Sequence, residues 1–328
     1  MEAGILKQLK ADAAKLGKTI VLPESHDERV LQAAAILMKG KIVSVVTIGN
    51  EDKIMKEAKR LNLDLSGIKI IDQEKSDKFE KFAEIFYELR RKKGITPEQA
   101  REILKRDLFF GAMLVREGVV DGSVGGSTAS TADVLRAGIQ CVGMPEGIST
   151  VSSFFLMAFP DKSYTFSDCG VVPNPNAEQL SDITISAAEN HTKLTKEKPV
   201  VAMLSFSTKG SAKDESIDKV LAALEIVKRK KPDLMVDGEL QFDAAVIESI
   251  GKRKAPGSAV AGKANVLIFP DLNSGNIAYK ITQRWGKAEA IGPLVQGLKK
   301  PCHDLSRGCS AEDIVSAAAI AALMSVSL

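Results

Sequence analysis

Short apolar runs rich in β-branched residues alternate along this chain with segments whose apolar residues recur at helical spacing. Apolar residues three or four positions apart predict one buried face of a helix, whereas a short continuous apolar run is typical of a buried strand. The runs that predict strands are residues 19–22, 42–48, 68–71, 150–158, 163–167, 200–204, 234–237 and 265–269. The segments that predict helices are residues 5–16, 28–38, 51–61, 79–91, 132–139, 215–229, 242–250, 276–284 and 314–327, with two more that begin at Pro97 and near Ala177.

Strands that alternate with helices of this length predict parallel β-α-β units and therefore an α/β fold. The runs 150–158 and 163–167 have no helix between them, so we expect them to form an antiparallel pair. Thr96 and Gln99 form a capping-box pattern with Pro97 at the first helical position, which fixes the start of one helix.

A chain of 328 residues can form one large domain or two modest ones. We place one boundary at Gly143-Met144-Pro145, and we expect the chain to return to the first domain near Gln296. The predicted first domain is residues 1–143 plus 297–328, and the second is residues 144–296, with an active-site cleft between them.

Charge and cysteine content argue against several classes of protein. The 45 basic and 42 acidic residues are spread along the chain and leave a net charge of +3, which is not the basic surface of a nucleic-acid-binding protein. No run of about 18 apolar residues predicts a membrane span, and the first residues lack the pattern of a signal peptide. The four cysteines show neither C-x-x-C pairing nor zinc-ligand spacing. We therefore expect a cytoplasmic protein in a reducing compartment.

The stretch from Pro301 to Asp313 places a hydroxyl, a guanidinium, a thiol and carboxylates in one short turn ahead of an Ala-rich helix. Ser310 lies at the N-cap position, with Asp313 three residues later. The free N–H groups of a helix N-terminus, with Arg307 beside them and Ser306 before them, can hold an anion. The alternative is structural, because Ser-x-x-Asp is close to a capping box in which Asp313 only secures the helix start.

A Gly/Ser/Thr loop at residues 122–131 precedes another predicted helix. Its amide groups and the hydroxyls of Ser127 and Thr128 can cradle a phosphate, and Arg136 lies about one helical turn further on. The loop matches neither a P-loop nor a dinucleotide-binding motif. An ordinary turn capped by Ser and Thr, with Arg136 on the surface, is therefore the alternative.

Two further stretches carry candidate binding residues. A polar loop at residues 271–276 follows an apolar strand and leads to Tyr279 and Lys280, and open α/β sheets bind ligands at the carboxyl ends of their strands. Arg90 ends a helix in a basic run, where the alternative is solvated side chains that complement the helix dipole. The three histidines share neither i, i+4 spacing nor a neighbourhood, so we expect no metal site.

Four stretches occur together in this chain: Leu305-Ser306-Arg307-Gly308-Cys309-Ser310 with Asp313, Gly125-Gly126-Ser127 ahead of Asp133-Val134-Leu135-Arg136, Phe269-Pro270-Asp271-Leu272-Asn273-Ser274-Gly275-Asn276, and Val236-Asp237-Gly238-Glu239-Leu240-Gln241. Together they resemble the phosphate acetyltransferase (phosphotransacetylase) family, and the similarity covers nearly the whole chain. The resemblance implies a two-domain α/β fold with mostly parallel sheets, related to the isocitrate and isopropylmalate dehydrogenases, and a homodimer.

The resemblance also implies the reversible reaction of acetyl-CoA with phosphate to give acetyl phosphate and coenzyme A. Coenzyme A is then a substrate, and no separate cofactor is expected. Relatives that act on butyryl groups share much of the pattern. Phosphate butyryltransferase, or another short-chain acyl-CoA:phosphate acyltransferase, is therefore the alternative.

The resemblance assigns a role to each matching residue. Asp313 matches the general base for the coenzyme A thiol, Arg307 the arginine that binds phosphoryl and carbonyl oxygens, and Ser306 a serine that steadies the thiol or the tetrahedral intermediate. Arg136 matches a second anion-binding arginine, and Arg90 one that contacts the coenzyme. A thiol with a pKa of about 8.5 is poorly matched to a carboxylate with a pKa of about 3.9. The base therefore requires a raised pKa for Asp313, or a thiol pKa lowered by Arg307.

Two other classes of protein remain open. An oxidoreductase on the same fold would need an aspartate cluster for a divalent metal, and the sequence shows no convincing one. A non-catalytic module that senses coenzyme A or phosphate would bind ligand without forming a thioester.

Cys309 lies two residues after Arg307 and could form an acetyl-cysteine. Coenzyme A brings its own thiol, however, so we expect direct attack within a ternary complex.

Overall fold

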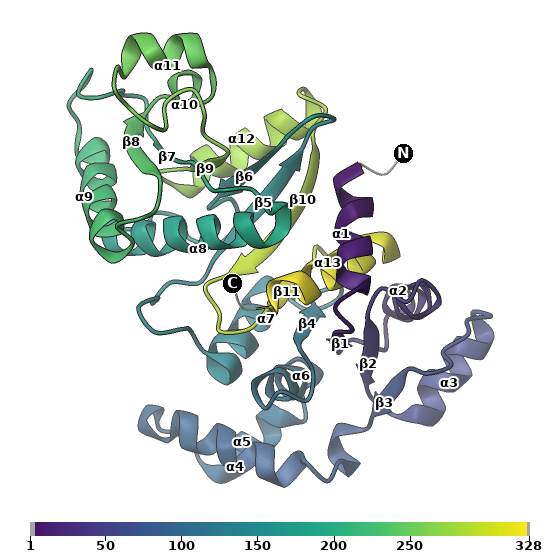
Figure 1. The fold of residues 1–328 in the computed structure, drawn as a ribbon. Helices are drawn as coiled ribbons and strands as arrows, with labels where there is room; N and C mark the ends of the chain where they lie inside the picture. Colours follow the sequence, from purple (N-terminus) through teal and green to yellow (C-terminus); the bar gives the residue numbers. More distant parts are fainter. Residues whose placement is uncertain (1–3, 327–328) are drawn as a thin grey trace.

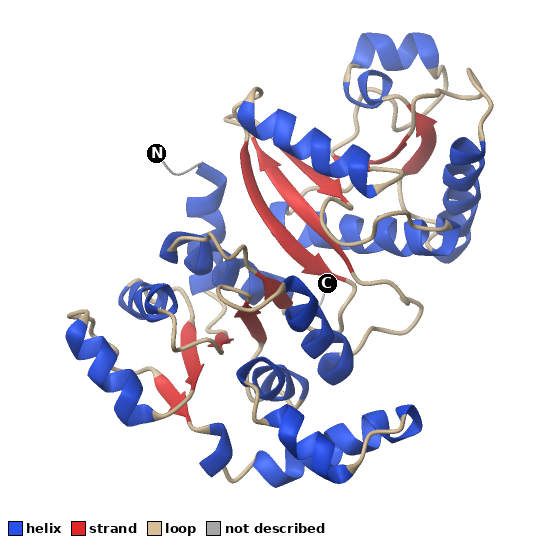
Figure 2. Ribbon diagram, turned by 180° about the vertical axis from the view of Figure 1, so that it is seen from behind, coloured by secondary structure: helices blue, strands red, loops and turns tan. Residues whose placement is uncertain are grey.

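Two β-sheets, each flanked by helices, make up the structure, a computed structural model that describes residues 4–326 (Figures 1 and 2). The first sheet has five parallel strands in the order β11-β4-β1-β2-β3. Its strands are β1 (Thr19–Leu22), β2 (Ser44–Ile48), β3 (Lys69–Ile71), β4 (Gly122–Gly125) and β11 (Cys302–Asp304). The helices in the same part of the chain are α1 (Gly4–Ala14), α2 (Glu28–Lys39), α3 (Glu51–Arg60), α4 (Phe79–Arg90), α5 (Pro97–Leu104), α6 (Asp107–Arg116), α7 (Thr131–Ala137) and α13 (Ala311–Met324).

The second sheet has six strands in the order β10-β5-β6-β9-β7-β8. The three strands β10, β5 and β6 are antiparallel, and β6, β9, β7 and β8 are parallel. These strands are β5 (Ser152–Ala158), β6 (Ser163–Ser167), β7 (Val201–Leu204), β8 (Val236–Leu240), β9 (Val266–Ile268) and β10 (Glu289–Gln296). The accompanying helices are α8 (Ala177–Thr195), α9 (Glu215–Lys230), α10 (Phe242–Val246), α11 (Glu248–Lys254) and α12 (Leu272–Arg284). The α/β class and the antiparallel pair are therefore confirmed.

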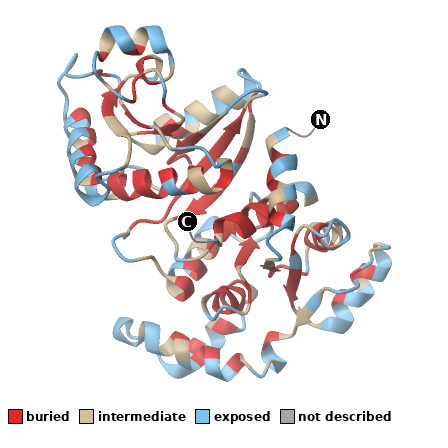
Figure 3. Cartoon of the chain, viewed as in Figure 1, coloured by how far each residue is buried: buried red, intermediate tan, exposed pale blue. Residues whose placement is uncertain are grey.

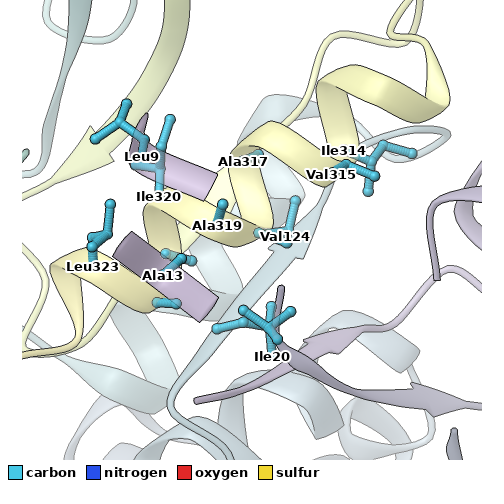
Figure 4. Packing of buried hydrophobic residues seen from close by; sticks show 14 of the residues in the cluster. Leu9, Ala13, Ile20, Val124, Ile314, Val315, Ala317, Ala319, Ile320 and Leu323 are labelled. Atoms are coloured by element: carbon cyan, nitrogen blue, oxygen red, sulfur yellow. The ribbon is translucent and has the colours of Figure 1, made fainter. Parts of the chain in front are cut away.

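Helix α13 lies between the two sheets and is buried along most of its length (Figures 1 and 3). A helix that is apolar on every side belongs in a protein interior. One continuous apolar cluster joins it to Ile20 and Val124 of the first sheet and to Phe154 and Leu294 of the second. Figure 4 shows Ala317 and Ala319 of this helix among the larger side chains of Leu9 and Val124. The chain thus crosses to the second sheet and returns, so that residues 302–324 complete the first.

Helix starts follow the capping patterns of the sequence. Complete capping boxes begin α5 at Thr96 and α13 at Ser310, as predicted, and a third begins α8 at Asn176. Each box satisfies two N–H groups that a helix start would otherwise leave free. The predicted end of the α13 segment at residue 327 lies outside the described residues.

Several element predictions were incomplete or wrong. The stretch 122–131 was expected to be a loop throughout, but residues 122–125 form the strand β4, and residues 302–304 of the expected 301–313 turn form β11. Helix α6 and strand β10 were not predicted, and the single helix expected at 242–250 is divided at Ile247. Strand β4 was not predicted because its glycines weaken the sequence pattern that is typical of a strand. A Cβ atom at Gly125 would lie 2.7 Å from Leu108, so this strand needs the missing side chain for close packing.

Candidate functional site

The structure brings together the two stretches that the sequence singled out, residues 122–131 and 301–313. Strand β11 pairs with β4, and the N–H of Leu305 donates to the carbonyl of Gly125 at 2.8 Å. Just beyond the strands, the Thr131 hydroxyl donates to a carboxylate oxygen of Asp304 at 2.6 Å. Because parallel strands place their carboxyl ends at one edge, the polar segments that follow β1, β4 and β11 meet there.

Arg29, near the start of α2, fastens these loops to one another. Its guanidinium donates to the carbonyls of Arg307 at 2.9 Å, Cys309 at 2.7 Å and Ser127 at 2.8 Å. The Asp27 carboxylate forms an ion pair with the same guanidinium at 2.7 Å and raises the pKa of Arg29. Planar guanidinium groups suit such a fixed set of acceptors. Arg29 was not among the predicted site residues, although it follows a buried strand and the polar residues after it.

The loop at residues 126–129 binds a carboxylate of the protein itself. The N–H groups of Gly126, Ser127, Thr128 and Ala129 donate to Glu24 at 2.5–3.0 Å. The hydroxyl of Thr128 adds a contact at 2.6 Å and that of Ser127 one at 3.3 Å. These bonds outweigh the opposing effect of burial and lower the pKa of Glu24, so the carboxylate stays charged.

The expectation of an open phosphate cradle in this loop is therefore corrected. The amides and hydroxyls of the loop do hold an anion, as the sequence predicted. The anion is Glu24, which lies 3% exposed at the end of β1. Ser127 is equally buried, and its hydroxyl faces this carboxylate. The hydroxyl of Thr128 also lies 3.0 Å from Nε2 of His26.

A cavity of about 380 Å³ lies between β10, the end of α12 and the start of α13. Its wall includes Ser306 and Asp313, together with Asp304, Cys309 and Arg284. Residues of both sheets therefore line it. Arg284 was not identified from the sequence, and it adds a cation on the side of the cavity formed by α12.

Asp313 has both of the features that the sequence left as alternatives. One of its carboxylate oxygens accepts hydrogen bonds from the N–H and the hydroxyl of Ser310, both at 2.8 Å, which completes the capping box. The side chain also lines the cavity and is exposed. The cap engages one oxygen, and no hydrogen bond to the other is present among residues 4–326. Capping and a role in the cavity are thus compatible.

Ser306 and Arg307 lie on the exposed turn between β11 and α13. The Ser306 hydroxyl accepts a bond from the N–H of Gly308 at 3.2 Å and faces the cavity wall. The backbone of Arg307 is held by Arg29, whereas its guanidinium makes no hydrogen bond or ion pair to any residue in the described range 4–326. An arginine with a fixed backbone and an unengaged head group can bind an anionic ligand.

Arg136 and Arg90 do not line this cavity. Arg136 forms an ion pair with Asp133 at 2.8 Å, and Asp133 also holds Arg106 at 2.9 Å. Arg90 is half-buried at the end of α4 and borders a surface hollow whose wall includes Ile95 and Gln140. Gln140 lies four residues after Arg136. The segment that carries Arg136 therefore borders the same hollow as Arg90.

The structure separates Tyr279 and Lys280 from the cavity. The Tyr279 ring stacks on Phe155 of β5, with ring centroids 4.1 Å apart, and packs in an apolar cluster on the second sheet. The ammonium group of Lys280 lies 5.8 Å from that ring on an exposed part of α12. The predicted ligand contact for these two residues is not supported by this position. Arg284, one turn further along α12, reaches the cavity instead.

Burial sets the charge of several groups around the site. Burial raises the pKa of the Cys309 thiol, and the opposing influence of Arg29 is smaller. Burial also raises the pKa of Asp304 to about 6, and the nearby charge of Glu24 adds to this rise. All four cysteines are buried and unpaired.

Within residues 4–326 no cluster of three or more His, Cys, Asp or Glu side chains suits a metal ion. No helix in this range is long and apolar enough to cross a membrane.

Comparisons with known proteins identify the family to which this chain is similar. The family model described as "Phosphate acetyl/butaryl transferase" matches residues 4–322. A phosphate acetyltransferase of Acetivibrio thermocellus is 52% identical over 325 residues, covering 97% of this chain and 96% of the relative. One of Bacillus subtilis is 47% identical over 303 residues, covering 92% of this chain and 93% of the relative.

Solved structures give the same result. A phosphotransacetylase from Staphylococcus aureus superposes with a TM-score of 0.92 at 41% identity and 98% coverage of both chains. A structure from Salmonella typhimurium described as a putative 4-hydroxythreonine-4-phosphate dehydrogenase has a TM-score of 0.53 at 13% identity, covering 94% of this chain and 99% of the other. The second likeness concerns the fold alone.

Proposed function

This chain belongs to the phosphate acetyl/butyryl transferase family, and we propose that it catalyses the reversible reaction of acetyl-CoA with phosphate to give acetyl phosphate and coenzyme A. The observation that carries this proposal is the turn between β11 and α13. It presents Ser306 and Asp313 to a cavity between the sheets, with the unengaged guanidinium of Arg307 on the same turn.

We propose direct attack by coenzyme A on acetyl phosphate while both substrates are bound. The thiol sulfur forms a bond to the carbonyl carbon, the bond between that carbon and the phosphate oxygen breaks, and the thiol proton ends on phosphate. Arg307 binds the phosphoryl and carbonyl oxygens, where negative charge develops. Ser306 steadies the thiol or the tetrahedral intermediate, and Asp313 accepts the thiol proton through the oxygen that the cap leaves unengaged. Positioning of two bound substrates supplies much of such a rate.

An assay of thioester formation tests the function. Purified protein is mixed with acetyl phosphate and coenzyme A, and the thioester absorbance is followed with time. We expect rapid thioester formation with acetyl phosphate and slower formation with butyryl phosphate. A preference for the butyryl substrate would favour the phosphate butyryltransferase alternative. Ligand binding without any thioester would favour a sensing module, and reduction of NAD(P)⁺ by a hydroxy acid would favour an oxidoreductase.

We expect Arg90→Ala to raise the KM for coenzyme A and to leave the KM for acetyl phosphate nearly unchanged, because Arg90 borders a hollow away from the cavity. Steady-state kinetics with coenzyme A and with its analogue lacking the 3′-phosphate measures this. If Arg90 binds that phosphate, the analogue reduces the activity of the wild type more than that of the variant. Arg91→Ala is the matched control, since Arg91 is exposed and pairs with Glu88 at 3.0 Å. Equal losses in wild type and variant would leave Arg90 as a solvated surface residue.

We expect Cys309→Ala to keep activity within about tenfold, which allows roughly 1.4 kcal/mol for lost packing. The Cys309 thiol has a raised pKa because it is buried, so little of it is present as the thiolate that a covalent route needs. Labelled phosphate should not exchange into acetyl phosphate when coenzyme A is absent. Rapid exchange under those conditions, abolished in Cys309→Ala, would establish an acetyl-cysteine intermediate instead.

We also propose that the protein is a cytoplasmic homodimer, as the family resemblance implies. Ile277 and Ile281 on one exposed face of α12, and Trp285 at its C-cap, follow four-residue spacing, and Trp285 is 83% exposed. An apolar stripe of this kind is typical of an interface, and a second copy of the chain is the occupant that we expect. Analytical ultracentrifugation should show a dimer, which Trp285→Ser weakens. A wild-type monomer at micromolar concentration would contradict it.

A further inference from the structure

Asp304 has a position in the site that the proposed roles do not use. It is the last residue of β11, directly before the turn that carries Ser306 and Arg307. Its backbone is in register with Gly125 of β4, and one carboxylate oxygen, Oδ2, accepts the bond from the Thr131 hydroxyl at 2.6 Å. Thr131 is the first residue of α7. One side chain therefore connects the start of the Ser306 turn with the start of the helix that carries Arg136.

The surroundings of Asp304 leave its carboxyl group little freedom. The residue is 7% exposed, and its other carboxylate oxygen, Oδ1, has no hydrogen-bond partner among residues 4–326. This oxygen lies against Gly126, where an added Cβ atom would be 2.3 Å from it. The same loop holds Glu24 through its amide groups. Two buried carboxyl groups thus flank a loop that has no side chain at residue 126.

We propose that Asp304 is a positioning residue of the acetyl-transfer site, which holds the turn carrying Ser306 and Arg307 in place against α7 through its bond to Thr131. This inference rests on the function proposed above. The Thr131 hydroxyl lies 2.6 Å from the carboxylate, and a hydroxyl bonds a charged carboxylate more strongly than a neutral acceptor. The ionised form of Asp304 is therefore the one that holds the turn, and protonation weakens the connection.

Ionisation of Asp304 lies within the range where enzymes of this kind can be assayed, because its pKa is raised to about 6. The titratable and charged groups on the elements that border Asp304, or that line the same cavity, include Glu24, Arg29, Asp133, Arg136, Arg284, Glu289, His303, Arg307, Cys309 and Asp313. Glu24 stays charged because its pKa is lowered, and buried His303 stays neutral because its pKa is lowered to about 4. The other groups and the substrates titrate in the wild type and in a variant at residue 304 alike. The ratio of the two pH profiles therefore isolates the ionisation of Asp304.

The test is Asp304→Asn, which keeps the size of the side chain and an acceptor for Thr131 but removes the ionisation. With acetyl phosphate and coenzyme A at pH 7.5, we expect kcat to fall roughly tenfold, because a displaced site loses rate rather than binding. Both KM values should change less than threefold. The wild-type kcat should fall as the pH drops through about 6, whereas the ratio of wild-type to variant kcat should approach one at pH 5.

Thr131→Val removes the donor and leaves Asp304 in place. We expect a similar loss of kcat, and no further loss when both substitutions are combined. Thr192→Val is the matched control, because Thr192 makes a hydroxyl-to-backbone bond on α8, away from the site. If Asp304→Asn does not fold, the Thr131→Val profile alone decides. Wild-type kcat and an unchanged pH profile in these variants would overturn the inference while the function stands. A wild type that forms no thioester would overturn both.

Discussion

Arg307→Ala is expected to lower kcat/KM for thioester formation by a hundredfold or more. The guanidinium of Arg307 has no partner among residues 4–326, while Arg29 fixes its backbone carbonyl at 2.9 Å. The head group is thus available to the oxyanion and phosphate charge that develop in the transition state. Removing one such donor typically costs about 2.7–4 kcal/mol of transition-state stabilisation.

The series of variants at residue 307 separates charge from geometry. Arg307→Lys keeps the positive charge but cannot donate two parallel hydrogen bonds to one anion, so it should restore only part of the rate. Arg253→Ala is a suitable control, because Arg253 is an exposed arginine on α11, outside the turn between β11 and α13. Steady-state kinetics in both directions is the measurement. A loss smaller than about tenfold, roughly 1.4 kcal/mol, would show that Arg307 has no direct part in the reaction.

Glu24→Ala should strongly reduce stability. The substitution leaves four backbone N–H groups and the Ser127 hydroxyl without their acceptor, in a part of the structure that is largely buried, and it removes one of the two hydrogen-bond partners of the Thr128 hydroxyl. Each buried donor that is left without an acceptor typically costs about 1–3 kcal/mol. Glu24→Gln should be nearly as harmful, because its amide NH₂ would face N–H donors. Denaturant unfolding at pH 7.5 measures both effects.

The contribution of Glu24 should also depend on pH with a defined sign. Its folded-state pKa lies below the ordinary value of 4.5, so its stabilisation is present above that value and is lost as the pH falls through the lowered pKa. The difference in unfolding free energy between wild type and Glu24→Ala should therefore shrink in acid. Glu225→Gln, an exposed substitution on α9 with a lysine partner at 3.0 Å, should change little. Equal stability of wild type and Glu24→Ala at pH 7.5 would contradict the structural role.

Much of the fold was predictable because the relevant signals are local. Apolar periodicity identified most helices and strands, and the capping boxes at Thr96 and Ser310 fixed two helix starts. Strand β4 was missed because glycine at Gly122 and Gly125 serves contacts with Pro301 and Leu108 from distant segments. Such a requirement depends on the packed structure and leaves no pattern along the chain.

The site was predictable only in part for a related reason. The sequence identified a loop at residues 126–129 that suits an anion, but it could not show that the anion is Glu24, about a hundred residues earlier. Likewise, Arg29 and Asp304 act through contacts with segments far away in the chain. The polar segment from Glu24 to Arg29, directly after a buried strand, was the available signal, because parallel sheets bind ligands at that edge.

The return of the chain to its first sheet has a consequence for biosynthesis. Strand β11 and helix α13 complete the sheet that begins with β1, yet the whole second sheet is translated before them. At roughly 5–20 residues per second, the ribosome takes on the order of 10–30 s to add the intervening segment. During that interval the nascent chain exposes the edge of β4 and the apolar surface that α13 later covers. The first half of the polypeptide therefore leaves the ribosome early but can complete its sheet and core only after the last residues have been added.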